Sequence, residues 1–176
     1  ASGDTTNIVG TLQNNGSALV TGKIGQVLSA TKTDVFTTTS TSYTDITGIT
    51  INITPAATSS KVLVTFSVTA STDTADRVFG FQLVRGSTAI GAGGSSGSRS
   101  VGTVAGAVET KNTKMNSYSM NFLDSPSSTS ALTYKLQTKA QTGGSNTVRI
   151  NSNGGDQDAN YNFRTISTIT VMEVLA

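Results

Sequence analysis

Hydrophobic and polar residues alternate one by one along much of this chain. In the clearest run, residues 61–70, one phase is apolar and the other is mostly polar. The apolar phase consists of Val62, Val64, Phe66, Val68 and Ala70. A period of two over this length is typical of a β-strand that places one face on a hydrophobic core.

The same alternation predicts further strands along the chain. Residues 26–39 are rich in Thr and indicate one bent strand or two, and within 78–85 the side chains of Phe79, Phe81 and Leu83 share one face. The other predicted strands are 49–54, 88–90, 100–108, 116–123, 132–137, 147–151 and 165–175. Many of the connections carry turn-forming residues, for example Asp124-Ser125-Pro126, Gly143-Gly144 and Asn153-Gly154-Gly155.

This series of strands, with no cluster of strong helix formers, predicts an all-β fold built as an antiparallel β-sandwich. The number of strands favours a jelly roll over a seven-stranded immunoglobulin-type domain, and another kind of sandwich is the alternative. We expect the sandwich domain over residues 24–176. Residues 1–23 alternate little and are expected to form an extended N-terminal arm that packs on a partner.

Composition excludes several chemistries. The 176 residues include 31 Thr and 23 Ser but no His, Cys or Trp, and the formal net charge is +2. Without His or Cys the chain lacks Ser-His-Asp and Cys-His catalysis and the ordinary ligands of zinc and haem. We therefore expect no enzyme and no cofactor. The small net charge and the lack of a basic cluster argue against a nucleic-acid partner.

No targeting or membrane segment is recognisable. The polar N-terminus is unlike a signal peptide, and the apolar runs are far shorter than the ~18 residues of a membrane-spanning helix. Ala1-Ser2 is what removal of an initiator methionine would leave, so we expect a nearly complete small protein. A trimmed chain would begin in the same way.

The most acidic loop, residues 151–162, is the candidate metal site. Asp156 and Asp158 lie near Asn151, Asn153 and Asn160, and Ca²⁺ binds about six to eight such oxygen ligands. The spacing departs from the EF-hand pattern, which needs a bidentate Glu at its last position. The alternative is a solvated connection in which Asn and Gly provide the turn geometry.

Two other motifs do not indicate a site. The Gly-rich stretch 91–97 lacks the following helix and the Gly-Lys-Ser/Thr of a phosphate-binding loop, which indicates a surface loop instead. Asp73 and Asp76 flank a turn, and nothing in the sequence supplies an apolar pocket that would raise the pKa of either carboxyl.

Two surfaces are candidates for binding. Tyr161 beside Arg164 provides an aromatic face and a polar group that could hold a sugar ring, although an aromatic residue that anchors the loop is the alternative. Leu63 on one predicted strand, and Val78 and Val84 on another, form a second apolar set opposite the core phase. A second apolar face is often an interface between subunits.

Several segments, in this order, carry a resemblance. They are 25–31 (Gly-Gln-Val-Leu-Ser-Ala-Thr), 42–48 (Ser-Tyr-Thr-Asp-Ile-Thr-Gly), 122–126 (Phe-Leu-Asp-Ser-Pro), 133–137 (Thr-Tyr-Lys-Leu-Gln) and 167–174 (Ser-Thr-Ile-Thr-Val-Met-Glu-Val). Over residues 23–176 the chain is similar to small β-domains of tailed bacteriophage virion proteins, notably of cyanophages and other marine phages. Residues 10–16 also resemble fibre-type sequence. The resemblance implies a jelly roll or similar sandwich, commonly trimeric, without catalytic residues.

The function that follows is structural. We expect a phage virion surface protein, a trimeric capsid decoration or cement protein whose N-terminal arm contacts the major capsid protein or another virion protein. The alternative is a receptor-binding fibre or tail-tip domain that holds a host surface glycan through the loops 91–100 or 151–162. Either way we expect the protein on the virion surface, with no nucleic-acid or membrane partner.

Overall fold

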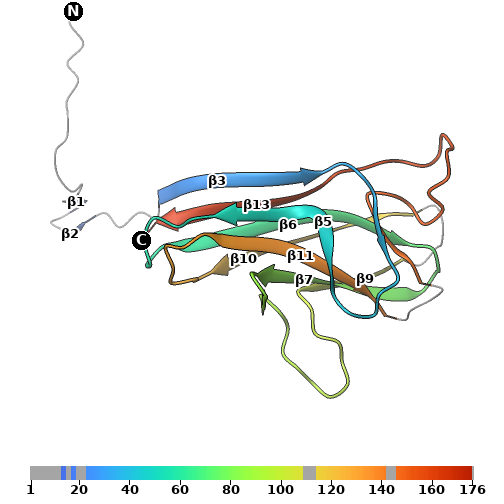
Figure 1. Cartoon of the computed structure of the whole chain (residues 1–176), viewed down its shortest axis with the longest axis horizontal. Coiled ribbons are helices and arrows are strands. Elements are labelled where there is room, and N and C mark those ends of the chain that lie inside the picture. Colours follow the sequence, from blue (N-terminus) through green and yellow to red (C-terminus); the bar gives the residue numbers. More distant parts are fainter. Residues whose placement is uncertain (1–12, 15–16, 19–22, 109–113, 142–145, 176) are drawn as a thin grey trace, which may run out of the picture.

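The computed structural model describes residues 13–14, 17–18, 23–108, 114–141 and 146–175, and these form β-strands and connections only (Figure 1). No described segment makes a helix of the length and hydropathy needed to cross a membrane. The strands are β1 (Gln13–Asn14), β2 (Ser17–Ala18), β3 (Lys23–Lys32), β4 (Phe36–Thr38), β5 (Thr44–Ile53), β6 (Lys61–Thr72), β7 (Arg77–Arg85), β8 (Thr88–Ile90), β9 (Val104–Val108), β10 (Asn116–Asp124), β11 (Leu132–Ala140), β12 (Val148–Ile150) and β13 (Ser167–Leu175).

Two antiparallel sheets form the domain. In sheet 1, β6 lies between β10 on one side and β13 and β12 on the other, and these two pair in turn with β3 and β4. In sheet 2, β11 lies between β5 and β7, and the far edge of β7 pairs with both β8 and β9. The bent segment expected over 26–39 is thus two strands, β3 and β4.

The strand order is that of a jelly roll. β8 and β9 follow one another along β7, and β12 and β13 follow one another along β6. β3 and β4 lie along β13 and β12 in turn, so each of the three pairs counts as one interrupted strand. Numbered this way in chain order, sheet 1 runs 1-8-3-6 and sheet 2 runs 2-7-4-5. This arrangement of eight antiparallel strands in two sheets is a jelly roll, which confirms the predicted fold class.

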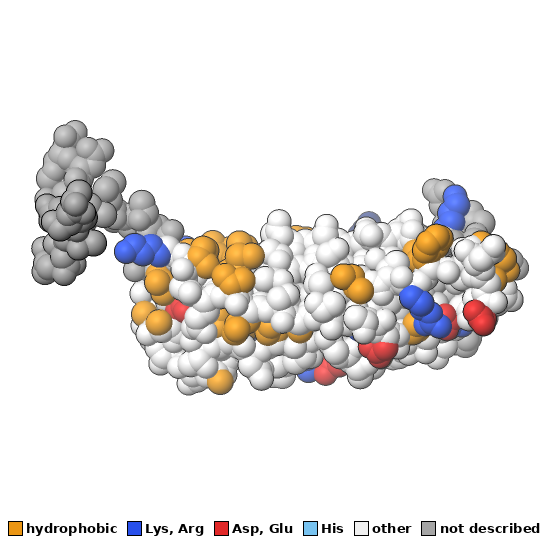
Figure 2. All heavy atoms as spheres, turned by 90° about the horizontal axis from the view of Figure 1, so that it is seen from above, with side chains coloured by type: hydrophobic (Ala, Val, Ile, Leu, Met, Phe, Trp, Pro, Cys, Tyr) orange, Lys and Arg blue, Asp and Glu red, His pale blue; other side chains and the backbone are white. Residues whose placement is uncertain are grey.

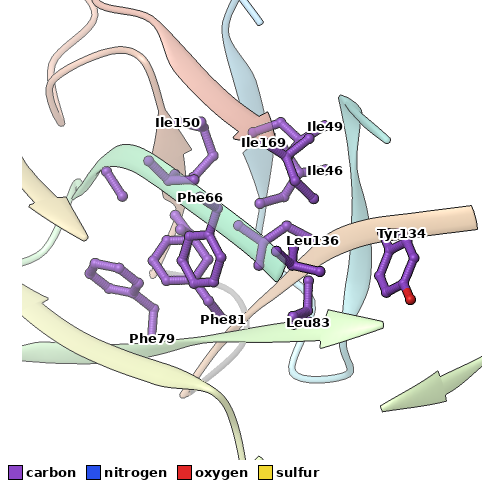
Figure 3. Close-up of a cluster of buried hydrophobic side chains, with 14 of the residues drawn as sticks. Ile46, Ile49, Phe66, Phe79, Phe81, Leu83, Tyr134, Leu136, Ile150 and Ile169 are labelled. Atoms are coloured by element: carbon purple, nitrogen blue, oxygen red, sulfur yellow. The ribbon is translucent and has the colours of Figure 1, made fainter. Parts of the chain in front are cut away.

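The core lies between the sheets and is made by the predicted phases. Val62, Val64 and Val68 of β6 are fully buried, and so are Phe81 and Leu83 of β7. Figure 3 shows the rings of Phe66, Phe79 and Phe81 gathered between the two sheets, with Ile46, Ile49 and Ile169 on one side of them. Along these strands the polar side chains therefore face outward and the apolar side chains face inward, so the two sheets pack as a sandwich.

One strand differs from the regular alternation. Ile49, Ile51 and Ile53 point to the core, but β5 begins earlier than the predicted strand and also buries Ile46, three positions before Ile49. The pairing of β5 with β11 shifts register between Lys135 and Gln137, and Gly48 adopts a positive φ of 85°. A bulge at this point turns Ile46 back to the core, and a left-handed backbone there favours glycine.

A polar cluster links the two sheets at one end of the core. Asp124 ends β10 and is 6% exposed. Its Oδ2 accepts hydrogen bonds from Arg85 Nη1 and from the Tyr134 hydroxyl, both at 2.6 Å. Burial, and then the neighbouring carboxylate, raise the pKa of Tyr134, so its hydroxyl stays protonated and donates. We call these three residues the cross-sheet triad.

The predicted arm lies mostly outside the described residues. Of residues 1–23 the structure describes the short antiparallel pair β1–β2 and Lys23, at which β3 begins. The extent and role of the arm therefore stay a prediction.

Candidate functional site

The outer face of sheet 1 carries a row of apolar side chains that crosses all four strand positions of the sheet. Met172 of β13 lies opposite Val27 of β3 and opposite Leu63 of β6, and Leu63 lies opposite Leu123 of β10. Directly paired residues share one face of a sheet. Ile24 and Val174 form a second, shorter row beside the first. We call these six residues the apolar band.

The band is open to solvent. Val27 is 56% exposed, Ile24 51% and Leu123 47%, whereas Leu63, Met172 and Val174 are half-buried by their neighbours. Seen from the β3 side, hydrophobic side chains gather at the end of the domain where β3 begins (Figure 2). Contiguous exposed apolar surface of this kind marks an interaction site more often than a solvated face.

The rest of this face is uncharged between the band and the far end of the sheet. Its outward positions carry only small polar side chains: Ser29, Thr31, Thr65, Ser67, Thr69, Ser117, Ser119, Asn121, Thr168 and Thr170. Ser29 and Thr170 join their hydroxyls at 2.9 Å. Depletion of charge around an apolar centre is the composition of a subunit interface.

A buried carboxylate fixes the backbone beneath the band. Glu173 lies between Met172 and Val174 but points inward, and it is 1% exposed. Its oxygens accept hydrogen bonds from the Ala56 backbone N–H at 2.6 Å and from Gln26 Nε2 at 2.8 Å. The Ala56 hydrogen bond holds the pKa of Glu173 below its usual range, so the carboxylate stays ionised. Through these two hydrogen bonds, the Glu173 carboxylate holds β3 and the loop after β5 against β13.

The residues predicted for an interface do not form one surface. Leu63 belongs to the band on sheet 1, whereas Val78 and Val84 point outward from sheet 2, on the opposite side of the sandwich. Val78 is 42% exposed, but Val84 is already covered within the chain, at 3%. The residues that sequence reasoning missed are Ile24, Val27, Leu123, Met172 and Val174. Strand alternation marked their outward phase, and only the pairing of the strands shows that they adjoin.

The candidate metal loop uses most of its oxygens internally. The Asn151 side chain donates to the carbonyls of Lys32 and Asp34, and Asp156 accepts from Ser152 at 2.5 Å and pairs with Arg164 at 2.9 Å. Asp158 is exposed and lines the same small hollow as Asp156 and Arg164. Among the described residues no three His, Cys, Asp or Glu side chains converge to hold a metal. Asn151, Ser152 and Asn153 are at most 1% exposed, so the start of the loop is packed against the domain.

Of the predicted glycan residues, Tyr161 lies in this loop and Arg164 lies just after it. Tyr161 is 58% exposed, and its hydroxyl donates to Gln157 Oε1 at 3.3 Å. Arg164 is turned to Asp156 by their ion pair. Phe163 and Ile166 nearby are 68% and 59% exposed. The loop thus presents apolar side chains to solvent, with the Arg164 charge already paired.

Comparison with known proteins adds little beyond this geometry. No protein family matches the chain, and no curated protein does. Among solved structures it is similar to a D431N mutant of the VP2 protein of infectious bursal disease virus in T=1 particles, with 16% identity and a TM-score of 0.43 over 98% of this chain and 44% of VP2. It is also similar to the Gx strain structure of that virus, with 14% identity and a TM-score of 0.46 over 96% of this chain and 42% of the other. The chain spans less than half the length of these proteins, and because the TM-scores are low the jelly-roll assignment rests on the strand order alone.

Proposed function

We propose that this chain is a non-enzymatic structural protein of a virus particle, exposed on the particle surface and assembled as a homotrimer through the apolar band. The observation that carries the proposal is the continuous row Val27–Met172–Leu63–Leu123 across the outer face of sheet 1. The resemblance of the sequence to phage virion domains supports the same role. On that resemblance we extend the proposal to a capsid decoration or cement protein of a tailed phage.

A second copy of the chain suits this face better than a charged partner. Copies of one surface meet with little like-charge repulsion where that surface carries little charge, and apart from Lys61 the band and its Ser and Thr surroundings are uncharged. Lys61 lies directly opposite Val174, at the end of the band's second row, and Lys23 lies opposite Leu175 at the same end of the sheet. Sheet 2, by contrast, is charged on its outer face, where Lys135 pairs with Asp45 at 2.8 Å.

Replacing Leu123 with aspartate is expected to convert the trimer into monomers. A carboxylate within an apolar interface is desolvated without a partner, whereas on a free surface it costs little. Light scattering coupled to size exclusion at micromolar protein would measure the mass, and circular dichroism would confirm the fold. The matched control is Val78→Asp, a similarly exposed valine on the opposite sheet, which should leave the trimer intact. A monomeric unaltered chain, or a trimeric Leu123→Asp variant, would contradict the proposal.

Deleting residues 1–22 is expected to abolish binding to the particle while the domain stays folded and trimeric. On this proposal the arm contacts the major capsid protein, and the sandwich from Lys23 onward contains the core and the band. Sedimentation of undecorated particles with the full-length or shortened chain measures the bound fraction. Equal decoration by both chains would refute the assignment of the arm.

The second candidate is a receptor-binding fibre or tail-tip domain. The strongly exposed Tyr161 and Phe163 favour it, because aromatic side chains on a loop are a common means of contacting a ligand. Imaging the protein on the virion separates the two candidates: a position on the capsid supports decoration, and a position at the tail tip supports receptor binding.

A further inference from the structure

A cleft of about 560 Å³ opens on the outer face of sheet 2, on the side of the sandwich away from the apolar band. Its floor includes Val78, Gly80 and Ala105, which β7 and β9 place side by side. Tyr43 and Lys139 line it as well, together with the segment that carries Arg99. Its volume lies within the range of small-molecule sites, about 300–1,000 Å³.

Tyr43 is held in place at this cleft by a close approach to the backbone. Its hydroxyl donates to the Val101 carbonyl at 2.7 Å. A Cβ at Gly80 would lie 2.9 Å from that hydroxyl oxygen, and one at Gly102 would lie 2.5 Å from it. Glycine at both positions leaves room for the Tyr43 hydroxyl, and the hydrogen bond to Val101 holds the partly buried ring as a wall of the cleft.

The charge of the cleft is positive and unbalanced. Lys139 Nζ lies 5.1 Å from the centroid of the Tyr43 ring and 2.9 Å from Ser100 Oγ, and Arg99 Nη1 reaches Ser96 Oγ at 3.1 Å. No carboxylate lines the cleft, and neither cation forms an ion pair within the described part of the chain. Lys135, on the same strand and face, differs because Asp45 neutralises it.

We propose that this cleft binds an acidic saccharide, a sugar unit that carries a carboxylate or a sulfate. The anionic group would contact Lys139 and Arg99, the sugar ring would lie against Tyr43 and the apolar floor, and ring hydroxyls would meet Ser98, Ser100 and Gln141. Fixed polar groups beside an aromatic wall suit a ligand with many hydroxyls. Lys139 and Arg99, which form no ion pair with a described residue, favour the charged form. The inference does not depend on the proposed role in the particle or on the apolar band.

The test is a binding titration of the full-length chain, followed by NMR or calorimetry. The probes are a uronate-containing disaccharide, a sulfated disaccharide, the neutral disaccharide of the same linkage and inorganic sulfate. We expect at least one acidic disaccharide to bind more tightly than both the neutral sugar and sulfate. Lys139→Gln should weaken that binding at least about tenfold, because it removes a charge-assisted hydrogen bond.

Two further variants make the result specific. Lys135→Gln removes the same charge from the same strand and face outside the cleft, and it should leave the affinity unchanged. Ala105→Leu fills the floor at an exposed position and should weaken binding without changing the charge. Equal affinity for the neutral sugar, equal affinity for inorganic sulfate, equal losses in Lys135→Gln and Lys139→Gln, or no binding of any probe at millimolar concentration would each overturn the proposal.

Discussion

Replacing Phe81 with alanine is expected to lower the free energy of unfolding by about 3–5 kcal/mol, the range for removing a buried aromatic ring. Phe81 is fully buried, and its ring packs edge-on against Phe79 at 5.7 Å and tilted against Tyr118 at 5.6 Å. Tyr118 belongs to sheet 1 and the two Phe residues to sheet 2, so the loss removes contact between the sheets. Urea unfolding followed by circular dichroism measures the change.

The control for Phe81 is Val78→Ala on the same strand. Val78 points to the other face and is 42% exposed, so its truncation should cost less than about 1 kcal/mol. The unfolding slope should stay the same in both variants, since each buries a similar surface when folded. Equal losses at the two positions would mean that the core is not on the Phe81 face.

Replacing Asp124 with alanine is expected to cost about 2–4 kcal/mol. The change leaves the buried Tyr134 hydroxyl without an acceptor and the partly buried Arg85 without its counter-charge. The lower end applies to the extent that Arg85, whose side chain is 27% exposed, recovers contact with water. Thermal and urea unfolding of the variant and the unaltered chain provide the measurement.

Asp45→Ala is the matched control for the cross-sheet triad. Asp45 also accepts from a cation and a neutral donor, Lys135 at 2.8 Å and Gln137 at 2.7 Å, but its side chain is 49% exposed. Exposed ion pairs contribute less than about 1 kcal/mol. A loss at Asp45 as large as that at Asp124 would show that burial does not distinguish the two carboxylates.

The strands and their inward faces could be predicted because both depend on neighbouring residues. The alternation of β6, from Val62 to Ala70, and the Phe79–Phe81–Leu83 face of β7 place the core phases correctly. The early start of β5 escaped prediction because a bulge at Gly48 breaks the period of two, so Ile46 appears out of phase. The sequence places Asp124 in a turn, and its buried role depends on Arg85 and Tyr134, which lie on other strands.

The candidate sites were predictable only in part. The sequence marks Leu63 as an outward apolar residue. The predicted set of Leu63, Val78 and Val84, however, combines residues from two opposite faces of the sandwich. The cleft escaped prediction altogether, because Tyr43, Gly80, Gly102 and Lys139 come from four separate segments. No local pattern reports that they meet.

The sequence by itself determined that this chain is a β-sandwich, because a two-residue period and turn residues are local properties that every folded arrangement must respect. It also determined which side chains the protein cannot use, because the sequence contains no His and no Cys. Only the tertiary structure decided which strands are neighbours. Pairing of β3 with β13, or of β10 with β6, joins residues far apart in the chain, and it is this pairing that turns scattered outward side chains into an apolar band on one face and a positive cleft on the other.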